Sequence, residues 1–474
     1  MYKPVIGLEI HVELNTKSKM FSPSVNLYDK NINTNISVID FAFPGTLPTV
    51  NKEAVNKAIS LAVALNTDIA PYLMFDRKNY YYPDLPKGFQ ITQMTKPLGK
   101  NGYLEIFDGE KYKKILIHQL HIEEDSASLD HKEDYSVINY NRVGVPLVEI
   151  VTEPCIESAD EAINFLENLR NIIKYLNVSD ADQTKGQIRC DVNVSLMKEE
   201  DTELGVRAEV KNVNSFQSVR EAINYEIERQ TLELNSGNKI KRETRRYSPD
   251  TGKTYSMREK ADAVDYKYYV EPNIPKIDIE PSLIETIKNN MIVLPNDRIK
   301  KYINEYLLTF KEAKVLIRDR KISDLFEDTI KLGSSPKDAS NWITMKLTEY
   351  LNKKMVEFDE ITLTSEMLNE LISLINNKTI SNEQAKKVFE VMIDESKLPS
   401  VIIKELGMEQ ISNEDEIRKF VNNILDENND AVNTYKSGKT NIVGFLMGQV
   451  LKASGGKINP GLANKILNEE ILKR

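Results

Sequence analysis

The stretch "VIGLEIHVEL", residues 5–14, alternates apolar and polar side chains with a period of two. Such alternation predicts a β-strand with one buried face and one polar face. The polar face carries Glu9, His11 and Glu13 in place of the Thr, Ser and Lys of an ordinary solvated sheet. Consecutive side chains on one strand face lie about 6.6–6.8 Å apart. The strand therefore presents two carboxylates and an imidazole in one row.

The composition is that of an ordinary soluble protein. With 474 residues, the chain is long enough for two or three domains, each with its own core. No apolar run approaches the roughly 20 residues of a membrane span, and the N-terminus lacks the basic segment and apolar core of a signal peptide. The two cysteines, Cys155 and Cys190, argue against a disulfide framework and fit a reducing cytoplasm. The formal charge of −9 argues against wholesale binding of phosphate backbones but permits a local basic surface.

The chain divides into a strand-rich part and a helical part. Strand patterns with Gly and Pro turns alternate with helical patterns as far as the proline-rich segment "EPNIPKIDIEPSL", residues 271–283. Beyond this segment nearly every stretch has helical periodicity. We therefore expect an α/β or α+β domain over residues 1–292, a helical domain over 293–408 and a small helical tail domain over 409–474.

Histidines and carboxylates are concentrated in the first domain. All four histidines precede residue 132, and the segment "HIEED" at residues 121–125 adds three acidic groups. Glu149 stands inside the apolar run "VPLVEIV", where a free carboxylate would be costly to bury. The pattern leaves two interpretations open, a metal site or a solvated strand face. Carboxylates with an imidazole would favour a hard ion, and the chain has neither an HExxH motif nor a CxxC pair to indicate a zinc protease or a zinc ribbon.

A P-loop is not present. The triplet GKT occurs at residues 252–254 and 438–440, but the first glycine that the motif requires is replaced by Tyr247 in one case and by Asn433 in the other. Any ATP site in this chain must therefore be of another type.

Seven motifs occur in one order over nearly 250 residues: "VIGLEIHVEL", "FDRKNYYYPDLPKGFQITQ", "HIEEDSASLDH", "YNRVGVPLVEIVTEP", "IRCDVNVSL", "AEVKNVNSF" and "ETRRYSPDTGKT". Together they resemble the B subunits of the aspartyl/glutamyl-tRNA(Asn/Gln) amidotransferases, the GatB family. The resemblance extends to the C-terminal segments "SNWITMKLTEYLNK", "SNEQAKKVFEVM" and "NIVGFLMGQVLKASGGKINP".

This resemblance implies a fold and a reaction. The fold would be α+β, with a glutamine-synthetase-like cradle on an antiparallel sheet, followed by an all-helical domain and a helical tail. The reaction would be that of a ligase with glutamine as the amido-nitrogen donor. ATP would phosphorylate the side-chain carboxylate of Glu-tRNA(Gln) or Asp-tRNA(Asn), and ammonia would then displace phosphate to give Gln-tRNA(Gln) or Asn-tRNA(Asn).

The resemblance also implies a set of site residues. Magnesium, with manganese as the alternative, would be held by the catalytic residues Glu9, His11, Glu124 and Glu149. A second set would contact ATP or substrate or line an ammonia path: Arg77, Lys78, Lys87, Asn141, Arg142, Lys211, Asn212, Asn214 and Ser215. Taken alone, each member of this second set is more typical of surface or turn chemistry than of a contact.

The C-terminal tail opposes the overall charge of the chain. Residues 431–474 contain seven basic and two acidic side chains, a formal charge of +5. The resemblance assigns tRNA engagement to this end, although lysines that merely coat solvated helix faces would look the same. The tRNA-binding candidates are Lys436, Lys439, Lys452, Lys457 and Lys465. Phosphate contacts of this kind add affinity without reading bases.

The sequence departs from the family at a few positions. Asn139 and Cys155 stand where family members commonly carry Asp, so neither is assigned to the metal. The cysteine pairs that suggest a zinc knuckle in some members are missing near the N-terminus, so no zinc is predicted.

An ammonia source is not visible either. The Ser pair at residues 334–335 lacks the surroundings of an amidase site, and neither cysteine stands in a nucleophile-elbow setting. We therefore expect the chain to act in the cytoplasm together with the amidase subunit and the small third subunit that the family implies. Two alternatives are a free-standing magnesium-dependent phosphotransferase or hydrolase acting on a small carboxylate, and a non-catalytic tRNA-binding scaffold. The sequence does not decide which amide is made.

Overall fold

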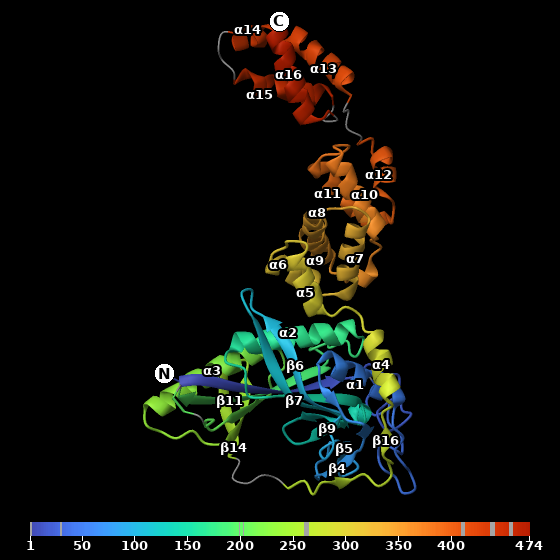
Figure 1. Cartoon of the computed structure of the whole chain (residues 1–474), viewed down its shortest axis with the longest axis vertical. Helices are drawn as coiled ribbons and strands as arrows, with labels where there is room; N and C mark the ends of the chain where they lie inside the picture. Colours follow the sequence, from blue (N-terminus) through green and yellow to red (C-terminus); the bar gives the residue numbers. More distant parts are fainter. Residues whose placement is uncertain are drawn as a thin grey trace. The chain divides into compact units, whose positions relative to one another are not determined.

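A nine-stranded sheet in the order β14-β13-β12-β11-β1-β10-β7-β6-β2 is the centre of the first of two units in the computed structural model (Figure 1). The model describes residues 2–28, 31–198, 200–201, 203–259, 265–408, 413–436, 441–454 and 458–474. The two units are Met1–Lys300 and Lys301–Arg474. The predicted boundaries at residues 292 and 408 remain predictions.

The predicted opening strand is confirmed as β1, the middle strand of the sheet, and its two neighbours are β10 and β11. Every neighbouring pair runs antiparallel except β12 and β13, which are parallel. The sheet is therefore mixed, which corrects the expectation of an antiparallel sheet. The parallel pair arises because helix α3 connects the two strands, and a parallel neighbour requires such a crossover. The strands are β1 (Tyr2–Glu13), β2 (Asp68–Ile69), β6 (Gly99–Phe107), β7 (Tyr112–Glu124), β10 (Pro146–Thr152), β11 (Ile188–Lys198), β12 (Ala208–Lys211), β13 (Glu243–Ser248) and β14 (Lys253–Glu259).

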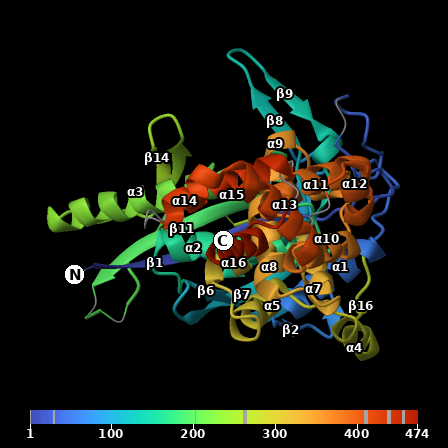
Figure 2. The same cartoon turned by 90° about the horizontal axis from the view of Figure 1, so that it is seen from above.

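Shorter strands form three small sheets in the same unit. One has β4 between β5 and β15, one pairs β3 with β16, and one is the β8–β9 hairpin, which extends away from the main sheet (Figure 2). Their bounds are β3 (Tyr72–Leu73), β4 (Asp76–Asn79), β5 (Phe89–Thr92), β8 (Ser128–His131), β9 (Ser136–Asn139), β15 (Tyr269–Val270) and β16 (Ile277–Asp278), and the 3₁₀-helix η1 (Tyr140–Arg142) follows β9.

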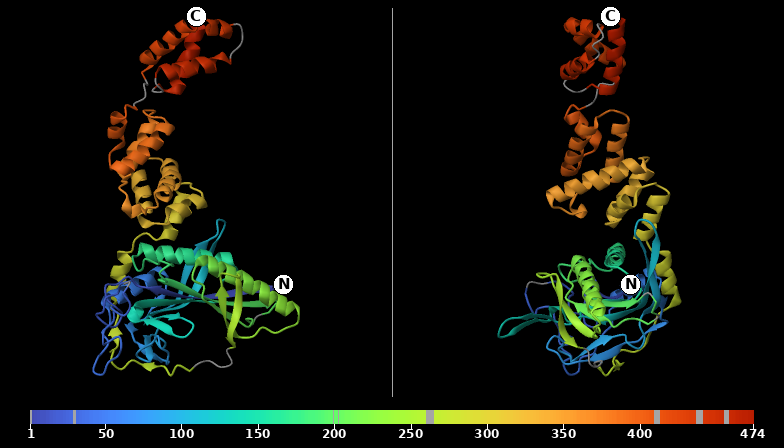
Figure 3. Two further views of the ribbon diagram at one scale, coloured as in Figure 1. Left: turned by 180° about the vertical axis from the view of Figure 1, so that it is seen from behind. Right: turned by 90° about the vertical axis from the view of Figure 1, so that its left-hand side faces the viewer.

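The long helices α2 and α3 cover one face of the main sheet (Figure 3). Ser158 caps α2 by accepting a hydrogen bond from the Glu161 backbone N at 3.1 Å, and two acidic residues in the first turn suit the positive end of the helix dipole. The helices of this unit are α1 (Lys52–Ala64), α2 (Ala159–Tyr175), α3 (Phe216–Asn235) and α4 (Pro281–Asn289), and α5 (Pro295–Asn304) spans the division between the units.

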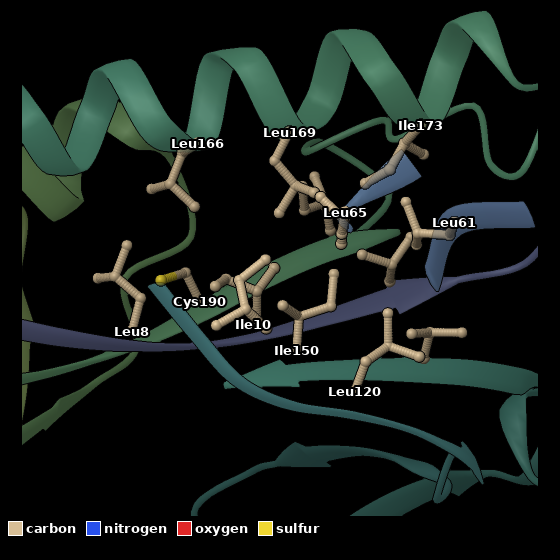
Figure 4. Close-up of a cluster of buried hydrophobic side chains, with 14 of the residues drawn as sticks. Leu8, Ile10, Leu61, Leu65, Leu120, Ile150, Leu166, Leu169, Ile173 and Cys190 are labelled. Atoms are coloured by element: carbon tan, nitrogen blue, oxygen red, sulfur yellow. The ribbon is translucent and has the colours of Figure 1, made fainter. Parts of the chain in front are cut away.

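The apolar face of the sheet forms the core under these helices (Figure 4). Ile10 of β1, Ile150 of β10 and Leu120 of β7 are fully buried and lie beneath Leu169 of α2 in the same cluster. Because side chains alternate along a strand, Glu9 and His11 of β1 must point to the opposite face. Packing of the core thus fixes which face carries the polar row.

The second unit contains helices, as the periodicity predicted. Its α11 begins with a capping box, in which Ser381 Oγ accepts from Gln384 N at 3.2 Å and Ser381 N donates to Gln384 Oε1 at 2.8 Å. Helices α13–α16 bury a core of their own that includes Leu425, Leu446 and Leu467. The helices are α6 (Phe310–Leu316), α7 (Arg320–Lys331), α8 (Pro336–Asn341), the π-helix η2 (Trp342–Leu347), α9 (Thr348–Lys354), the 3₁₀-helix η3 (Phe358–Glu360), α10 (Ser365–Asn376), α11 (Asn382–Glu395), α12 (Pro399–Glu405), α13 (Glu414–Glu427), α14 (Asn429–Lys436), α15 (Ile442–Ala453) and α16 (Pro460–Lys473). Within the described residues, none of the helices has the length and apolar character needed to cross a membrane.

Replacing Ile150 by Ala should lower the free energy of unfolding of the first unit by about 2–5 kcal/mol, because it leaves a cavity at the centre of the core. Leu116→Ala is the matched control, since Leu116 lies on the neighbouring strand but is 47% exposed. Its expected loss is below about 1 kcal/mol. Denaturant unfolding measures both, and equal losses would contradict the assignment of the two faces.

Candidate active site

Glu149 lies between two histidines on the polar face of the sheet. In the register of the central strands, His11 of β1 stands opposite Glu149 of β10, which in turn stands opposite His121 of β7. Glu149 Oε2 lies 3.2 Å from His11 Nε2 and 3.5 Å from His121 Nε2. The three side chains therefore form a continuous polar row across three adjacent strands.

Glu123 supplies a second carboxylate between the same two histidines. Its Oε1 lies 3.4 Å from His11 Nε2 and its Oε2 lies 3.6 Å from His121 Nε2. Glu123 is 3% exposed and His121 is 7% exposed, so this cluster is largely withdrawn from water. Two carboxylates and two imidazoles in such a place compensate one another's charge.

Two overlapping groups of donor atoms in the described residues have spacings that suit a metal ion. One consists of Glu9, His11 and Glu149, and the other of His121, Glu123 and Glu149, with the donor atoms of each group within 4.8 Å of one another. Mixed carboxylate and imidazole donors suit Mn²⁺ or Zn²⁺, and the excess of carboxylates over imidazoles also permits Mg²⁺. The residues present thus fit a divalent cation, and Glu149 belongs to both groups.

The surroundings hold both imidazoles in the protonated form at neutral pH. Burial lowers the pKa of His11, but the hydrogen bond to Glu149 and the charges of Glu123, Glu149 and Glu9 outweigh burial and raise the pKa from 6.5 to about 9. His121 behaves alike: burial lowers its pKa, whereas Glu149 and Glu123 raise it to about 10. Burial raises the pKa of Glu149, but the two histidines lower it well below its usual value. Glu149 therefore stays ionised, while burial and the neighbouring Glu149 raise the pKa of Glu9.

Glu124, expected as a metal ligand, belongs to neither group. Its Oε1 pairs with Lys87 Nζ and accepts a hydrogen bond from the Ile91 backbone N at 3.0 Å. Strand alternation turns Glu124 away from the face that Glu123 occupies, because the two residues are neighbours at the end of β7. The structure thus places Glu123, which was not among the expected ligands, between the histidines. A metal role for Glu124 remains a prediction.

Among the other expected contacts, the charge of Lys78 interacts with Glu123 and Glu149, and the charge of Lys211 interacts with Glu9. Burial lowers the pKa of Lys78, but the charges of Glu123 and other neighbouring groups raise it overall. Lys211 Nζ pairs with Asp191 and lies 3.1 Å from Glu209 Oε1.

The remaining expected contacts mainly have structural partners. Arg77 NH2 donates to Glu271 Oε1 at 3.1 Å, Asn212 Nδ2 donates to Tyr247 O at 3.1 Å, and Asn214 is exposed. Ser215 caps α3, with its Oγ accepting from Ser218 N at 3.0 Å.

The η1 turn has its own network of backbone contacts. Asn141 Oδ1 accepts from Asn35 N and Asn141 Nδ2 donates to Asn31 O, both at 2.8 Å. Arg142 Nε donates to Ser126 O at 2.9 Å. These two side chains therefore fix loops beside the site.

Three of the five expected tRNA contacts can be placed. Lys436 lies at the end of α14, Lys452 in α15 and Lys465 in α16, and all three are exposed. Lys439 and Lys457 lie outside the described residues.

Neither Arg189 nor Asp191 was a candidate from the sequence, whereas His121 and Glu123 lie in the acidic segment "HIEED" but were not assigned to the metal. Arg189 stands opposite His11 and Asp191 opposite Glu9 in the pairing of β11 with β1. The alternation in "IRCDVNV" already places Arg189 and Asp191 on one face. Only the strand order, which a single sequence does not provide, brings that face beside His11.

Comparison with known proteins gives two family matches and many full-length relatives. Residues 4–285 match the family described as the GatB/GatE catalytic domain, and residues 324–471 match the GatB domain. The relatives include B subunits of the aspartyl/glutamyl-tRNA(Asn/Gln) amidotransferase. The chain is 45% identical to the one from Oceanobacillus iheyensis, 46% to the one from Geobacillus kaustophilus and 47% to the one from Staphylococcus aureus. Each alignment covers 100% of both chains.

Binding of Mn²⁺ to the first group of donors should strengthen as the pH rises toward about 9. An imidazole binds a metal as the neutral base, so the ion must displace the proton of His11 below the raised pKa. The expected gain is about tenfold in affinity per pH unit for each proton displaced, and it ends above the pKa. Calorimetry in buffers of different ionisation enthalpy measures affinity and proton release together.

His118→Ala is the control for this titration, because His118 Nδ1 lies 2.7 Å from Glu153 Oε1 in an exposed pair outside the row. This variant should keep the pH dependence of the unaltered protein, whereas His11→Ala should lose it. An affinity that does not change between about pH 6.5 and 9 would show that no histidine takes part.

Proposed function

The chain belongs to the GatB/GatE family, and we propose that it activates the side-chain carboxylate of Glu-tRNA(Gln) or Asp-tRNA(Asn) with ATP and then amidates it. The relatives named above are the B subunits of amidotransferases that act on aspartyl- and glutamyl-tRNA. The protein is thus one component of a multi-subunit ligase with a tRNA substrate. The observation that carries the assignment to this domain is the row of Glu9, His11 and Glu149 on its central sheet.

The chemistry explains why such a row is required. A carboxylate resists attack by ammonia because oxide would have to leave, whereas an acyl phosphate loses phosphate readily. ATP and the carboxylate are both anions, so the site must hold them in line against their repulsion. A bound Mg²⁺ or Mn²⁺ would supply charge compensation and a template for the phosphate oxygens. Glu9, His11 and Glu149 would hold that ion, and the partly buried ammonium of Lys78 would add a positive charge that acts on Glu149.

The structure of the first unit supports a glutamine-synthetase-like cradle for this reaction. The polar row lies on the sheet face opposite the core under α2, so the helices α2 and α3 do not cover it. Lys87, paired with Glu124, and Lys211, paired with Asp191, stay candidates for an ammonia path or a nucleotide contact.

Ammonia should come from a partner amidase subunit, and a small third subunit should complete the assembly. Cys190 is buried, and burial raises its thiol pKa well above the usual value, which makes it a poor nucleophile. Ser334 Oγ donates to Asn369 Oδ1 at 2.8 Å, and Ser335 caps α8. Because these groups have structural roles, we expect the nucleophile that releases ammonia from glutamine on another chain. Assembly with translation enzymes, together with two free cysteines, supports a cytoplasmic location.

The tail is the proposed contact for the body of the tRNA. Residues 409–430 carry seven acidic and two basic side chains, which is the reverse of residues 431–474. The tail domain is therefore neutral overall, and any attraction to phosphate must come from its C-terminal half. Lys436, Lys452 and Lys465 are the exposed residues to which we assign it.

In the assembled amidotransferase, His11→Ala should abolish formation of Gln-tRNA while glutamine hydrolysis by the partner continues. The substitution removes a proposed metal ligand from one active site and leaves the other untouched. Quantifying Gln-tRNA and free glutamate in the same reaction measures both activities, and His118→Ala is the matched control. Amide formation at the normal rate in His11→Ala would overturn the metal assignment.

The same assay separates the alternatives. A free-standing phosphotransferase would consume ATP with free glutamate in the absence of tRNA and partners. A non-catalytic scaffold would bind tRNA, and neither a divalent cation nor the row would affect its function. Glutaminase activity in the purified chain alone would refute the proposed division of labour.

Changing Lys436, Lys452 and Lys465 together to Ala should raise the KM for Glu-tRNA(Gln) and reduce the salt dependence of tRNA binding. Each lost phosphate contact should lower the slope of log affinity against log salt by about 0.7–0.9. Lys473→Ala is the control, because Lys473 Nζ pairs with Glu470 Oε1 at 2.6 Å, much closer than the 3.9 Å between Lys465 Nζ and Glu469 Oε1. Deletion of residues 409–474 should have a stronger effect and preserve ATP binding. Unchanged affinity and slope in both variants would make the tail a structural appendage.

A further inference from the structure

Arg189 extends the polar row by one strand. In the pairing of β11 with β1, Arg189 stands directly opposite His11, and opposite residues on antiparallel strands have Cβ atoms about 4.5–5.5 Å apart on the same face. The order along the row is thus Arg189, His11, Glu149 and His121. A permanent cation therefore flanks the proposed metal ligands on the side opposite His121.

Asp125 holds this guanidinium in place. Asp125 is 5% exposed, and its Oδ2 lies 2.6 Å from Arg189 NH2 and 3.4 Å from Arg142 Nε. Burial raises the pKa of Asp125, but the charges of Arg189 and Arg142 outweigh it and lower the pKa overall, so the carboxylate stays ionised. The backbone N of Asp125 donates to Val145 O at 2.9 Å, and Ser126 N donates to Asp125 Oδ1 at 2.8 Å. The anchor is therefore itself fixed to the main chain.

Arg189 keeps one donor that no other described residue uses. Its NH2 donates to Asp125, whereas its buried Nε has no hydrogen-bond partner among the described residues. The side chain is 32% exposed, so part of Arg189 remains accessible from solvent. A guanidinium that a carboxylate holds on one side, and that is partly exposed, can still donate charge-assisted hydrogen bonds to an anion. Arg142 differs, because its Nε and NH2 donate to Ser126 O and Ala127 O.

We propose that Arg189 binds the phosphoryl group while it moves from ATP to the side-chain carboxylate, and that Asp125 is a positioning residue for Arg189. In this step the bond between the γ-phosphorus and the β,γ-bridging oxygen breaks, and ADP keeps the electron pair. A carboxylate oxygen forms the new bond to phosphorus, and no proton is transferred. Arg189 donates N–H groups to the non-bridging oxygens, which carry the charge in the transition state. This inference rests on the proposed function and adds the residue that stabilises its first step.

The planar guanidinium explains why arginine is suited to this place. Its N–H groups form a fork that matches two oxygens of a phosphoryl group, and the side chain cannot lose its charge near the other cations. A lysine would supply charge without the fork. Arg189→Lys should therefore retain only part of the activity.

The test uses the assembled amidotransferase with Arg189→Ala, Arg189→Lys and Asp125→Asn. Arg220→Ala is the matched control, since Arg220 pairs with Asp160 on the surface. Glutamine hydrolysis by the partner and the thermal melting of each variant report assembly and folding. Steady-state kinetics of amide formation give kcat and KM, and calorimetry gives the affinities for ADP and for the β,γ-imido analogue of ATP.

Arg189→Ala should lower kcat about 100-fold or more, and the analogue should bind about tenfold less tightly, the order of one lost charge-assisted contact. ADP should bind as before, because it lacks the γ-phosphoryl group. Added guanidinium ion should restore part of the rate in Arg189→Ala but not in a variant that has merely lost structure. Asp125→Asn should lower kcat with little change in the KM for tRNA, since it only loosens the guanidinium.

Three results would overturn the inference. One is a kcat within about threefold of the unaltered enzyme in Arg189→Ala, a difference too small for a contact in the transition state. Another is unchanged affinity for the ATP analogue with a raised KM for Glu-tRNA(Gln), which would place Arg189 on the acceptor instead. The third is a lack of rescue by guanidinium in a folded, assembled variant. By contrast, an unaltered complex that makes neither Gln-tRNA nor Asn-tRNA would reject the proposed function itself.

Discussion

The first unit depends on one partly buried electrostatic arrangement, the placement of Glu149 between His11 and His121 at the middle of the sheet. An isolated carboxylate in such a position would be expensive, and the two imidazoles with Lys78 nearby compensate for it. The next residue along the strand, Ile150, is fully buried on the other face. A shift of the register by one residue would place the carboxylate in the core and the isoleucine among the charges. The hydrophobic core and the polar row therefore specify the same pairing of strands.

This coupling explains how a sheet can serve as a catalytic platform. Four adjacent strands each contribute a polar side chain at corresponding positions, and the core under α2 restrains all four backbones. Groups on strands are positioned more precisely than groups on loops, which suits a reaction whose partners must lie in line. The loop residue Asp125 has a different role: it follows the end of β7, and its carboxylate pairs with Arg189 of β11.

Part of this arrangement could be predicted from the sequence. The two-residue alternation of residues 5–14 predicted β1 and its polar face. The lone carboxylate in "VPLVEIV" indicated Glu149 as a candidate metal ligand. Helical periodicity predicted the second unit. These features are local, and strand alternation or helix periodicity determines them without knowledge of the neighbouring strands.

The rest of the candidate site depends on contacts between distant segments of the chain. Strand alternation places Glu123 on the face of His121, but only the pairing of β7 with β10 and of β10 with β1 brings that face beside Glu149 and His11. Arg189 and the parallel pair β12–β13 were missed for the same reason, because both depend on the strand order.

The central claim is that the row on this sheet transfers phosphate from ATP to a tRNA-bound carboxylate. The most direct measurement follows radiolabel from the γ-phosphate of ATP in the assembled enzyme with Glu-tRNA(Gln), without glutamine or ammonia. We expect label on Glu-tRNA that hydroxylamine releases as phosphate, and we expect this label to be lost when Glu149 is replaced by Gln. Amide formation without cleavage of ATP, or label transfer that persists in Glu149→Gln, would contradict the claim.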